Sequence, residues 1–144
     1  MRESMKQKVK VLIENEGQLL LLKPIGKKKL TLIGGSVGKG ETVCSSLIRE
    51  AWEEAGIMLD TTLLTMAYRK LVRVKNKWVM FHCYLVRYEP FLFELKERHK
   101  FEYLDWMPME KGLNKLRGVE QKAARILIDK YIINTVGQEL SLGA

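Results

Sequence analysis

The sequence contains only two cysteines and three prolines, and it has no long hydrophobic run. Cys44 and Cys83 are too few for a disulfide framework, and they share no metal-type spacing with each other or with His82 and His99. We therefore expect reduced thiols in a cytoplasmic protein. No apolar run approaches the roughly 20 residues that span a bilayer, and the first residues lack the apolar stretch of a secretory signal. The sequence thus predicts no membrane partner.

Ser/Gly-rich linkers, internal repeats and low-complexity tracts are also missing. The 144 residues are enough for one hydrophobic core, and 47% hydrophobic with 29% charged residues is a globular balance. We therefore expect residues 1–144 to form a single domain.

The charge is strongly positive, at +8 from 25 Lys and Arg against 17 Asp and Glu. This excess favours anionic partners, which include phosphorylated small molecules, nucleic acids and acidic surfaces. The sequence has no aromatic-interleaved motif of the RNA-recognition type. A phosphorylated small molecule is therefore the favoured partner, and nucleic acid stays open as the weaker alternative.

Short β-rich runs begin the chain. Residues 9–13 and 19–22 are apolar and enclose a loop that contains Gly17, so they predict a β-hairpin. Residues 30–33 predict a further strand, which the Gly34-Gly35 pair would end.

Further β-rich runs cover residues 63–74, 78–88 and 101–107. Apolar residues at helical spacing between Val119 and Ile133 predict a closing helix. Because the strands outnumber the helices and do not alternate with them, the fold class is expected to be α+β.

A glycine-rich loop leads into a predicted central helix, which Gly56 would terminate. The helix carries apolar residues at the i, i+3, i+4 and i+7 spacing of an amphipathic helix: Ile48, Ala51, Trp52 and Ala55. On a helical wheel, Glu50, Glu53 and Glu54 fall within an arc of about 100°, and the four apolar residues together with Leu47 cover the other side. Crowded carboxylates repel each other. A divalent cation would relieve this repulsion, because Mg²⁺ and Mn²⁺ prefer hard oxygen ligands of this kind. The alternative is that the acidic face of this helix is exposed to solvent and that lysines relieve the repulsion between its carboxylates.

From Gly35 to Ile57 the chain resembles the Nudix box, G-x5-E-x7-R-E-U-x-E-E-x-G-U, in which U is aliphatic. Every fixed position matches: Gly35, Glu41, Arg49, Glu50, Glu53, Glu54 and Gly56. The resemblance implies a Nudix-type α/β/α sandwich, with a mixed β-sheet and the box helix packed on it. One departure is Ile33, where many family members carry a proline before the glycine pair.

The resemblance also implies roles for these residues. The residues that match the catalytic set of the family are Arg49, Glu50, Glu53 and Glu54. Those that match its metal ligands are Gly35, through a main-chain carbonyl at the Gly34-Gly35 turn, and Glu50, Glu53 and Glu54. Arg49 and Glu41 match residues that orient these acids through ion pairs, and Gly35 and Gly56 match positions with tight backbone shapes. The implied cofactor is Mg²⁺, with Mn²⁺ as the alternative.

The implied reaction is hydrolysis of a phosphoanhydride bond, in a nucleoside diphosphate linked to another moiety or in a nucleoside triphosphate. A phosphate-rich substrate, such as a diphosphoinositol polyphosphate or a 5′-phosphorylated RNA end, is an alternative motivated by the +8 charge. A non-catalytic nucleotide-binding module is a second alternative, and the intact acids argue against it. A homodimer is one expected assembly, since many relatives are dimers.

Several residues outside the box also merit a prediction. Upstream of Trp106, a further carboxylate could complete the site, and Glu102 is preferred over Glu94 and Glu97; the alternative is a solvated strand residue. The cluster from Lys27 to Lys29 could bind substrate phosphates, or it could be a solvated loop tip.

The β-rich runs suggest two more placements. His82 is expected to be a core or cross-strand residue rather than a catalytic one. Strand alternation places four cations on one face of a hairpin, either solvated or facing an anion: Arg69, Arg73, Lys75 and Lys77.

Overall fold

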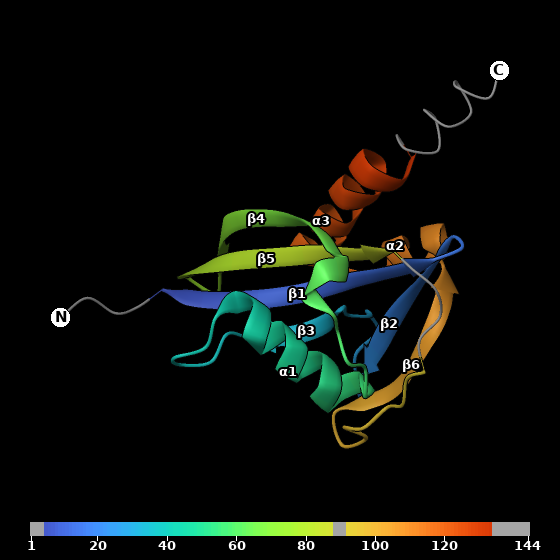
Figure 1. The fold of residues 1–144 in the computed structure, drawn as a ribbon, viewed down its shortest axis with the longest axis horizontal. Helices are drawn as coiled ribbons and strands as arrows, with labels where there is room; N and C mark the ends of the chain where they lie inside the picture. Colours follow the sequence, from blue (N-terminus) through green and yellow to red (C-terminus); the bar gives the residue numbers. More distant parts are fainter. Residues whose placement is uncertain (1–4, 88–91, 134–144) are drawn as a thin grey trace.

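The computed structural model describes residues 5–87 and 92–133 (Figure 1). The predicted strand end at Tyr88 therefore lies outside the described residues. The strands are β1 (Lys6–Asn15), β2 (Gln18–Pro24), β3 (Ile33–Ser36), β4 (Leu64–Val74), β5 (Lys77–Arg87) and β6 (Phe101–Pro108). The helices are α1 (Val43–Ala55), α2 (Met109–Lys115) and α3 (Gly118–Ile128), with a short 3₁₀ turn η1 (Thr61–Leu63) and a π-helical turn η2 (Asp129–Ile133).

The six strands form one mixed sheet, in which five follow the order β4-β5-β1-β2-β6 and the sixth, β3, pairs with β1. β1 runs parallel to β5 and antiparallel to its other neighbours. One end of β1 pairs with β2, and the other pairs with the short strand β3. The expected mixed sheet and α+β class are confirmed.

Hydrophobic alternation along β1 divides the molecule into layers. Val9, Val11 and Ile13 are fully buried in a core that includes Leu47 of α1. Leu12, which points to the opposite face, is buried in a second core that includes Leu127 of α3. Figure 1 accordingly shows α1 on one side of the sheet and α3 on the other. The expected α/β/α sandwich is confirmed.

Both predicted hairpins close with two-residue turns. Glu16 and Gly17 have φ values of 49° and 80°, and Lys75 and Asn76 have values of 49° and 64°. Two consecutive positive φ angles are typical of type I′ turns, whose twist matches that of the flanking strands.

The turn at Lys75 corrects one prediction about the basic hairpin. Lys75 belongs to the turn, and Lys77 pairs with Val74 rather than sharing a face with Arg73. Arg73 instead pairs with Trp78 and stacks over its ring at 5.5 Å. The turn residues interrupt strand alternation, so the cations divide between the two faces.

His82 behaves as a cross-strand core residue, as expected. It is buried, pairs with Arg69 on β4, and its Nε2 lies 2.9 Å from Oε1 of Gln7. Burial, together with the charge of Arg69, lowers the pKa of His82 below its ordinary value. His82 is therefore a neutral imidazole that is buried in the core and hydrogen-bonded to Gln7.

The prediction for residues 30–33 is wrong in its bounds. The strand β3 begins at Ile33 and continues through Gly34 and Gly35 instead of ending there. A Cβ on Gly34 would lie 2.1 Å from the carbonyl oxygen of Val9, and this glycine has a φ of 140°. Glycine therefore permits the close pairing of β3 with β1, rather than stopping the strand.

The helix α2 has no counterpart among the predicted elements. It carries Gly112 in its interior, which disfavours a helix in isolation. A Cβ on Gly112 would lie 3.0 Å from Cδ1 of Leu21, so the glycine allows α2 to pack closely on β2.

Cys44 and Cys83 are both free thiols, and burial raises the pKa of Cys83 far above its usual range. Among the described residues, no helix is both long and apolar enough to cross a bilayer.

Candidate active site

Capping interactions of nearby residues fix both ends of the box helix α1. The Thr42 hydroxyl accepts a hydrogen bond from the backbone N–H of Ser45, whose hydroxyl oxygen in turn accepts one from the N–H of Thr42. This capping box fixes the start of the helix. Gly56 adopts the left-handed conformation with a φ of 63°, as expected for a residue that ends a helix.

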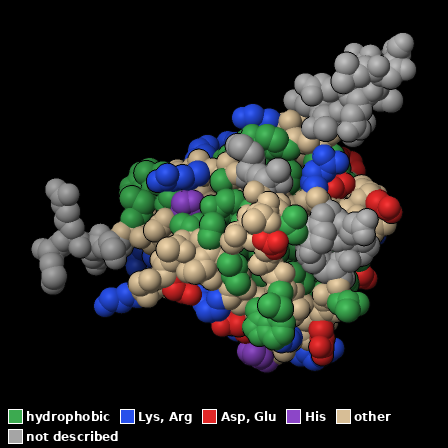
Figure 2. All heavy atoms as spheres, viewed as in Figure 1, with side chains coloured by type: hydrophobic (Ala, Val, Ile, Leu, Met, Phe, Trp, Pro, Cys, Tyr) green, Lys and Arg blue, Asp and Glu red, His purple; other side chains and the backbone are tan. Residues whose placement is uncertain are grey.

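The buried face of α1 is rotated relative to the predicted one. Leu47, Ala51 and Ala55 are buried, whereas Ile48 and Trp52 are 37% and 49% exposed. Figure 2 shows hydrophobic side chains at the surface near the C-terminal end of α1. The apolar face is thus centred between Leu47 and Ala51, which turns Glu54 toward the sheet.

Glu54 is buried, contrary to the expectation of three acids on an open face. Its Oε1 accepts a hydrogen bond of 2.8 Å from the backbone N–H of Gly34 on β3. Burial raises the pKa of Glu54 to about 7, although the nearby Lys10 charge opposes the rise. No cationic side chain in the described part of the chain forms an ion pair with Glu54.

Glu50 lies directly against β3, beside Gly35. A Cβ on Gly35 would come within 2.8 Å of the Glu50 carboxylate. Gly35 does not have a positive φ, so the expectation of a tight backbone shape is wrong for this glycine. Glycine is needed at this position because any side chain would displace Glu50.

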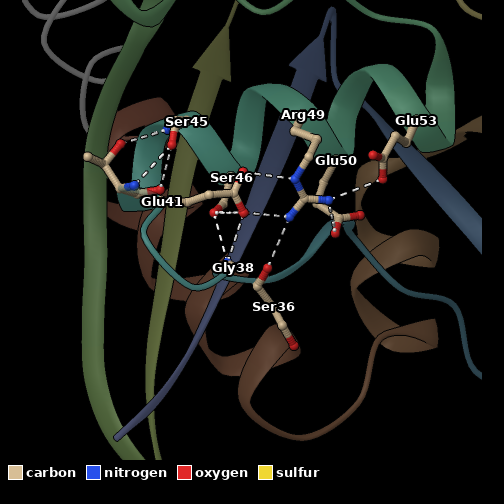
Figure 3. A network of polar contacts seen from close by, with 9 residues as sticks. Ser36, Gly38, Glu41, Ser45, Ser46, Arg49, Glu50 and Glu53 are labelled. Carbon is tan, nitrogen blue, oxygen red and sulfur yellow. Dashed lines mark hydrogen bonds and ion pairs between the residues drawn. The ribbon is translucent and has the colours of Figure 1, made fainter. Parts of the chain in front are cut away.

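Arg49 organises the exposed side of the site (Figure 3). Its Nε and Nη2 donate to the two carboxylate oxygens of Glu41 at 2.9 and 3.0 Å. Its Nη1 donates to Oε1 of Glu50 at 3.0 Å and to Oε2 of Glu53 at 3.2 Å. One guanidinium therefore contacts three carboxylates and fixes their relative positions.

Glu41 holds Arg49 from the loop before the helix. Its Oε1 also accepts hydrogen bonds from the N–H of Gly38 and the hydroxyl of Ser46. The hydrogen bond from Arg49 is the main cause that lowers the pKa of Glu41 to about 2. The same pairing raises the pKa of Arg49. Both side chains therefore stay charged throughout the neutral range.

The acids of α1 provide a donor set suited to a hard divalent cation. Among residues 5–87 and 92–133, no three His, Cys, Asp or Glu side chains form a ready-made metal site. Glu50 and Glu53 are bound to Arg49, and Glu54 is directed to Gly34. Carboxylate oxygens and a buried carboxylate without a cationic partner nonetheless fit Mg²⁺ or Mn²⁺. Cation binding would require small movements of these side chains.

The structure brings Glu97, rather than Glu102, to the box acids. Glu102 forms an ion pair of 3.3 Å with Lys23 on the strand pair β2–β6. The charge of Glu97, by contrast, contributes to the raised pKa of Glu54. Backbone hydrogen bonds explain this placement, because Lys96 N donates to the Glu54 carbonyl. The sequence favoured Glu102, and the path of the loop brings Glu97 to the box acids instead.

A pocket of about 520 Å³ opens on the face of the sheet that carries α3. Lys27 and Lys29 line this pocket, whereas Lys28 is not part of its lining. Lys10 also lines the pocket, and its Nζ donates to the carbonyls of Leu32 and Gly34 at 3.1 Å each. The Gly34 peptide thus contacts Glu54 through its N–H and Lys10 through its carbonyl.

Comparison with known protein families gives one decisive match. A sequence model described as the NUDIX domain matches residues 6–129, which is most of the chain. This chain belongs to the Nudix family. A search among curated proteins gave no match for the sequence of this Nudix chain.

Solved structures share the Nudix fold at low sequence identity. The MutT NUDIX hydrolase of Burkholderia pseudomallei is 23% identical with a TM-score of 0.66, over 90% of this chain and 99% of that one. The MutT protein of Methanosarcina mazei Go1 is 22% identical with a TM-score of 0.72, over 92% and 99%. A bifunctional NMN adenylyltransferase/ADP ribose pyrophosphatase of Francisella tularensis, complexed with AMP and a manganese ion, is 19% identical with a TM-score of 0.69, over 90% and 42%.

Proposed function

We propose that this Nudix protein is a pyrophosphohydrolase that cleaves a phosphoanhydride bond in a nucleotide, with a divalent cation as cofactor. The observation that carries this proposal is the set of carboxylates on α1, which Arg49 and the glycines of β3 hold in place. A protein that only bound nucleotides would have no need of three crowded carboxylates on one helix, because like charges at this spacing repel each other.

The residues that would hold Mg²⁺ or Mn²⁺ are Glu50, Glu53, Glu54 and the carbonyl of Gly35. When bound, the cation would neutralise phosphate charge and lower the pKa of the attacking water. Arg49 bridges Glu50 and Glu53 through Nη1, and its positive charge offsets the repulsion between the two carboxylates. Glu41 fixes Arg49 from behind and acts as a positioning residue.

Glu97 is the residue that we assign as the fourth carboxylate, in place of Glu102. It lies on the loop that hydrogen-bonds to the end of α1, and Lys100 pairs with it at 2.9 Å. An additional acid near the box acids would accept a proton from water or complete the metal ligands.

The proposed substrates are nucleoside diphosphates linked to another moiety, or nucleoside triphosphates. Support comes from family membership and from the related structure described as an ADP ribose pyrophosphatase with AMP and manganese. A substrate with additional phosphates is the second candidate, because the chain carries a net charge of +8.

A substrate panel tests the proposal. Purified protein would be incubated with ADP-ribose, dinucleoside polyphosphates and nucleoside triphosphates in Mg²⁺ or Mn²⁺, and release of orthophosphate, pyrophosphate and nucleoside monophosphate would be measured. The Glu53→Gln variant serves as the control for contaminating hydrolases. The proposal would be contradicted if the wild type and the Glu53→Gln variant hydrolysed every substrate at the same rate.

A further inference from the structure

Lys100 places a positive charge beside the box acids, although it lies far from them in the sequence. Its Nζ forms an ion pair of 2.9 Å with Oε2 of Glu97, the acid that the loop before β6 brings to the end of α1. The hydrogen bond to Glu97 is the main cause that raises the pKa of Lys100 above its ordinary value, and the charges of Glu50 and Glu54 act in the same direction. The ammonium group of Lys100 therefore interacts with three carboxylates of the site.

The backbone of Lys100 is fixed, whereas its side chain is not. The N–H of Lys100 donates to the Glu97 carbonyl at 2.9 Å, and its own carbonyl accepts a hydrogen bond of 3.0 Å from the N–H of Ile25. The side chain is 57% exposed, and among the described residues it forms an ion pair with Glu97 alone. The fold thus sets the position of Lys100, while rotation of the side chain is enough to withdraw its charge.

Two other cations near the acids are held more firmly. Arg49 donates to three carboxylates of the site. Lys10, whose charge acts on Glu54, donates to one hydroxyl and two backbone carbonyls. Several hydrogen bonds must break before either of these side chains moves. Lys100, which is held by one exposed ion pair, is the cation that can leave the acids at little cost.

The charge of Lys100 has two opposite effects at this site. Glu54 is buried, and the side chains of Glu50 and Glu97 are only 16% and 19% exposed, so their mutual repulsion is weakly screened by solvent. A cation beside them reduces this repulsion in the metal-free protein. The same positive charge repels a divalent cation that approaches these carboxylates.

We propose that Lys100 is an internal counter-ion of the box acids and that it competes with the divalent cation for them. In the metal-free protein, its ammonium group compensates part of the negative charge of Glu50, Glu54 and Glu97. The affinity for the cation is therefore lower than the carboxylates alone would give. This inference rests on the proposed function and deepens it, because a residue outside the box controls the affinity of the proposed metal site.

Direct metal binding tests the role of Lys100 without any turnover. The Kd of Mn²⁺ would be measured by electron paramagnetic resonance at low salt and pH 8, above the pKa of about 7 of Glu54. We expect Lys100→Gln to bind Mn²⁺ about 3- to 10-fold more tightly than the wild type. The gain should shrink at high salt, where the charge of an exposed lysine is screened. Lys100→Arg keeps the charge and should retain the Kd of the wild type.

The matched control is Lys23→Gln, which removes a lysine from an ion pair of 3.3 Å with Glu102, away from the acids. Its Kd should equal that of the wild type, and circular dichroism would verify that every variant is folded. The role of Lys100 is overturned if Lys100→Gln binds Mn²⁺ no more tightly than the wild type, or if Lys100→Arg or Lys23→Gln shows the same gain.

Hydrolysis of the substrate panel is assayed separately. If Lys100→Gln shows the expected gain in affinity and the wild type hydrolyses no substrate, the hydrolase is refuted and the role of Lys100 stands. If the wild type hydrolyses a substrate and the Kd values of Lys100→Gln and the wild type are equal, only the role of Lys100 is refuted. A wild type that does not bind Mn²⁺ would contradict both.

Discussion

Glu54 accepts a 2.8 Å hydrogen bond from the backbone N–H of Gly34, which joins the box helix to strand β3. The same carboxylate is buried and lacks an ion-pair partner among the described residues. One side chain therefore both anchors the helix and carries charge at a cost in stability, and a bound cation would offset that cost.

The first prediction concerns the stability of the metal-free protein. Burial raises the pKa of Glu54 from 4.5 to about 7, so the folded state retains a proton that the unfolded chain releases above pH 4.5. The free energy of unfolding should therefore decrease as pH rises from 4.5 to 7 and level off above 7. Glu54→Gln should remove this dependence and stabilise the metal-free protein at pH 8 by on the order of 3 kcal/mol at most.

Chemical denaturation at pH 5 and pH 8 in EDTA measures this difference. The exposed Glu53→Gln variant is the control, and it should show the pH dependence of the wild type. Added Mg²⁺ should stabilise the wild type more than Glu54→Gln. If the free energy of unfolding changed equally between pH 5 and pH 8 in Glu54→Gln and in the wild type, the assignment of a raised pKa to Glu54 would be contradicted.

The second prediction concerns the metal. Hydrolysis should disappear in excess EDTA and return with Mg²⁺ or Mn²⁺, because the acids supply the oxygen ligands. Glu53→Gln should lower kcat by roughly 100-fold or more while the protein remains folded, since a metal ligand is lost from an exposed position. Steady-state kinetics over a metal titration, with circular dichroism for folding, checks both effects. Near-normal kcat for Glu53→Gln at saturating metal would mean that the acids are a surface feature.

The third prediction distinguishes two carboxylates outside the box. Glu97→Gln should lower kcat, whereas Glu102→Gln should leave it almost unchanged, because Glu102 is paired with Lys23 away from the acids. The two variants remove the same charge and serve as controls for each other. The pH dependence of kcat/KM for both proteins provides the measurement, and equal effects would reject the assignment of Glu97.

The fourth prediction concerns Arg49. Arg49→Lys keeps the positive charge but loses the two-pronged contact with Glu41 and the bridge between Glu50 and Glu53. We expect kcat to fall about 10- to 100-fold and the metal affinity to change with it, as for other residues that orient metal ligands. Arg125→Lys, at an exposed ion pair with Glu110, is the matched control. Wild-type kcat and metal affinity in Arg49→Lys would show that charge alone is sufficient.

The fifth prediction concerns the lysine cluster before β3. Replacing Lys27, Lys28 and Lys29 with Gln should raise KM and flatten its salt dependence while kcat stays nearly constant, because contacts to a remote part of the substrate stabilise ground and transition states alike. Exposed charge pairs contribute about 0.2–1 kcal/mol each, so two pocket lysines predict an increase in KM of about 2- to 30-fold. Lys28→Gln alone should have no effect, since Lys28 does not line the pocket. If the triple variant and the wild type had equal KM values and parallel salt curves, the cluster would be only a solvated loop.

The sequence by itself determined the elements whose signals are local. The box pattern identified α1 and its acids, Gly56 ended the helix, and Gly17 marked the first hairpin. The apolar runs at residues 9–13 and 19–22 were enough to expect the paired strands β1 and β2. These features depend on neighbouring residues and on the hydrophobic period, both of which are readable from one chain.

The tertiary structure decided everything that depends on contacts between distant segments. Gly34 and Gly35 look like a strand end, yet pairing with β1 makes them strand residues. Glu54 looks like one of three exposed acids, yet packing of α1 on the sheet buries it. Glu102 is the preferred extra carboxylate from the sequence, yet the loop before β6 brings Glu97 to the end of α1. The basic pocket is likewise assembled from segments that are far apart in sequence, because charge and burial at a site are set by which segments meet in space.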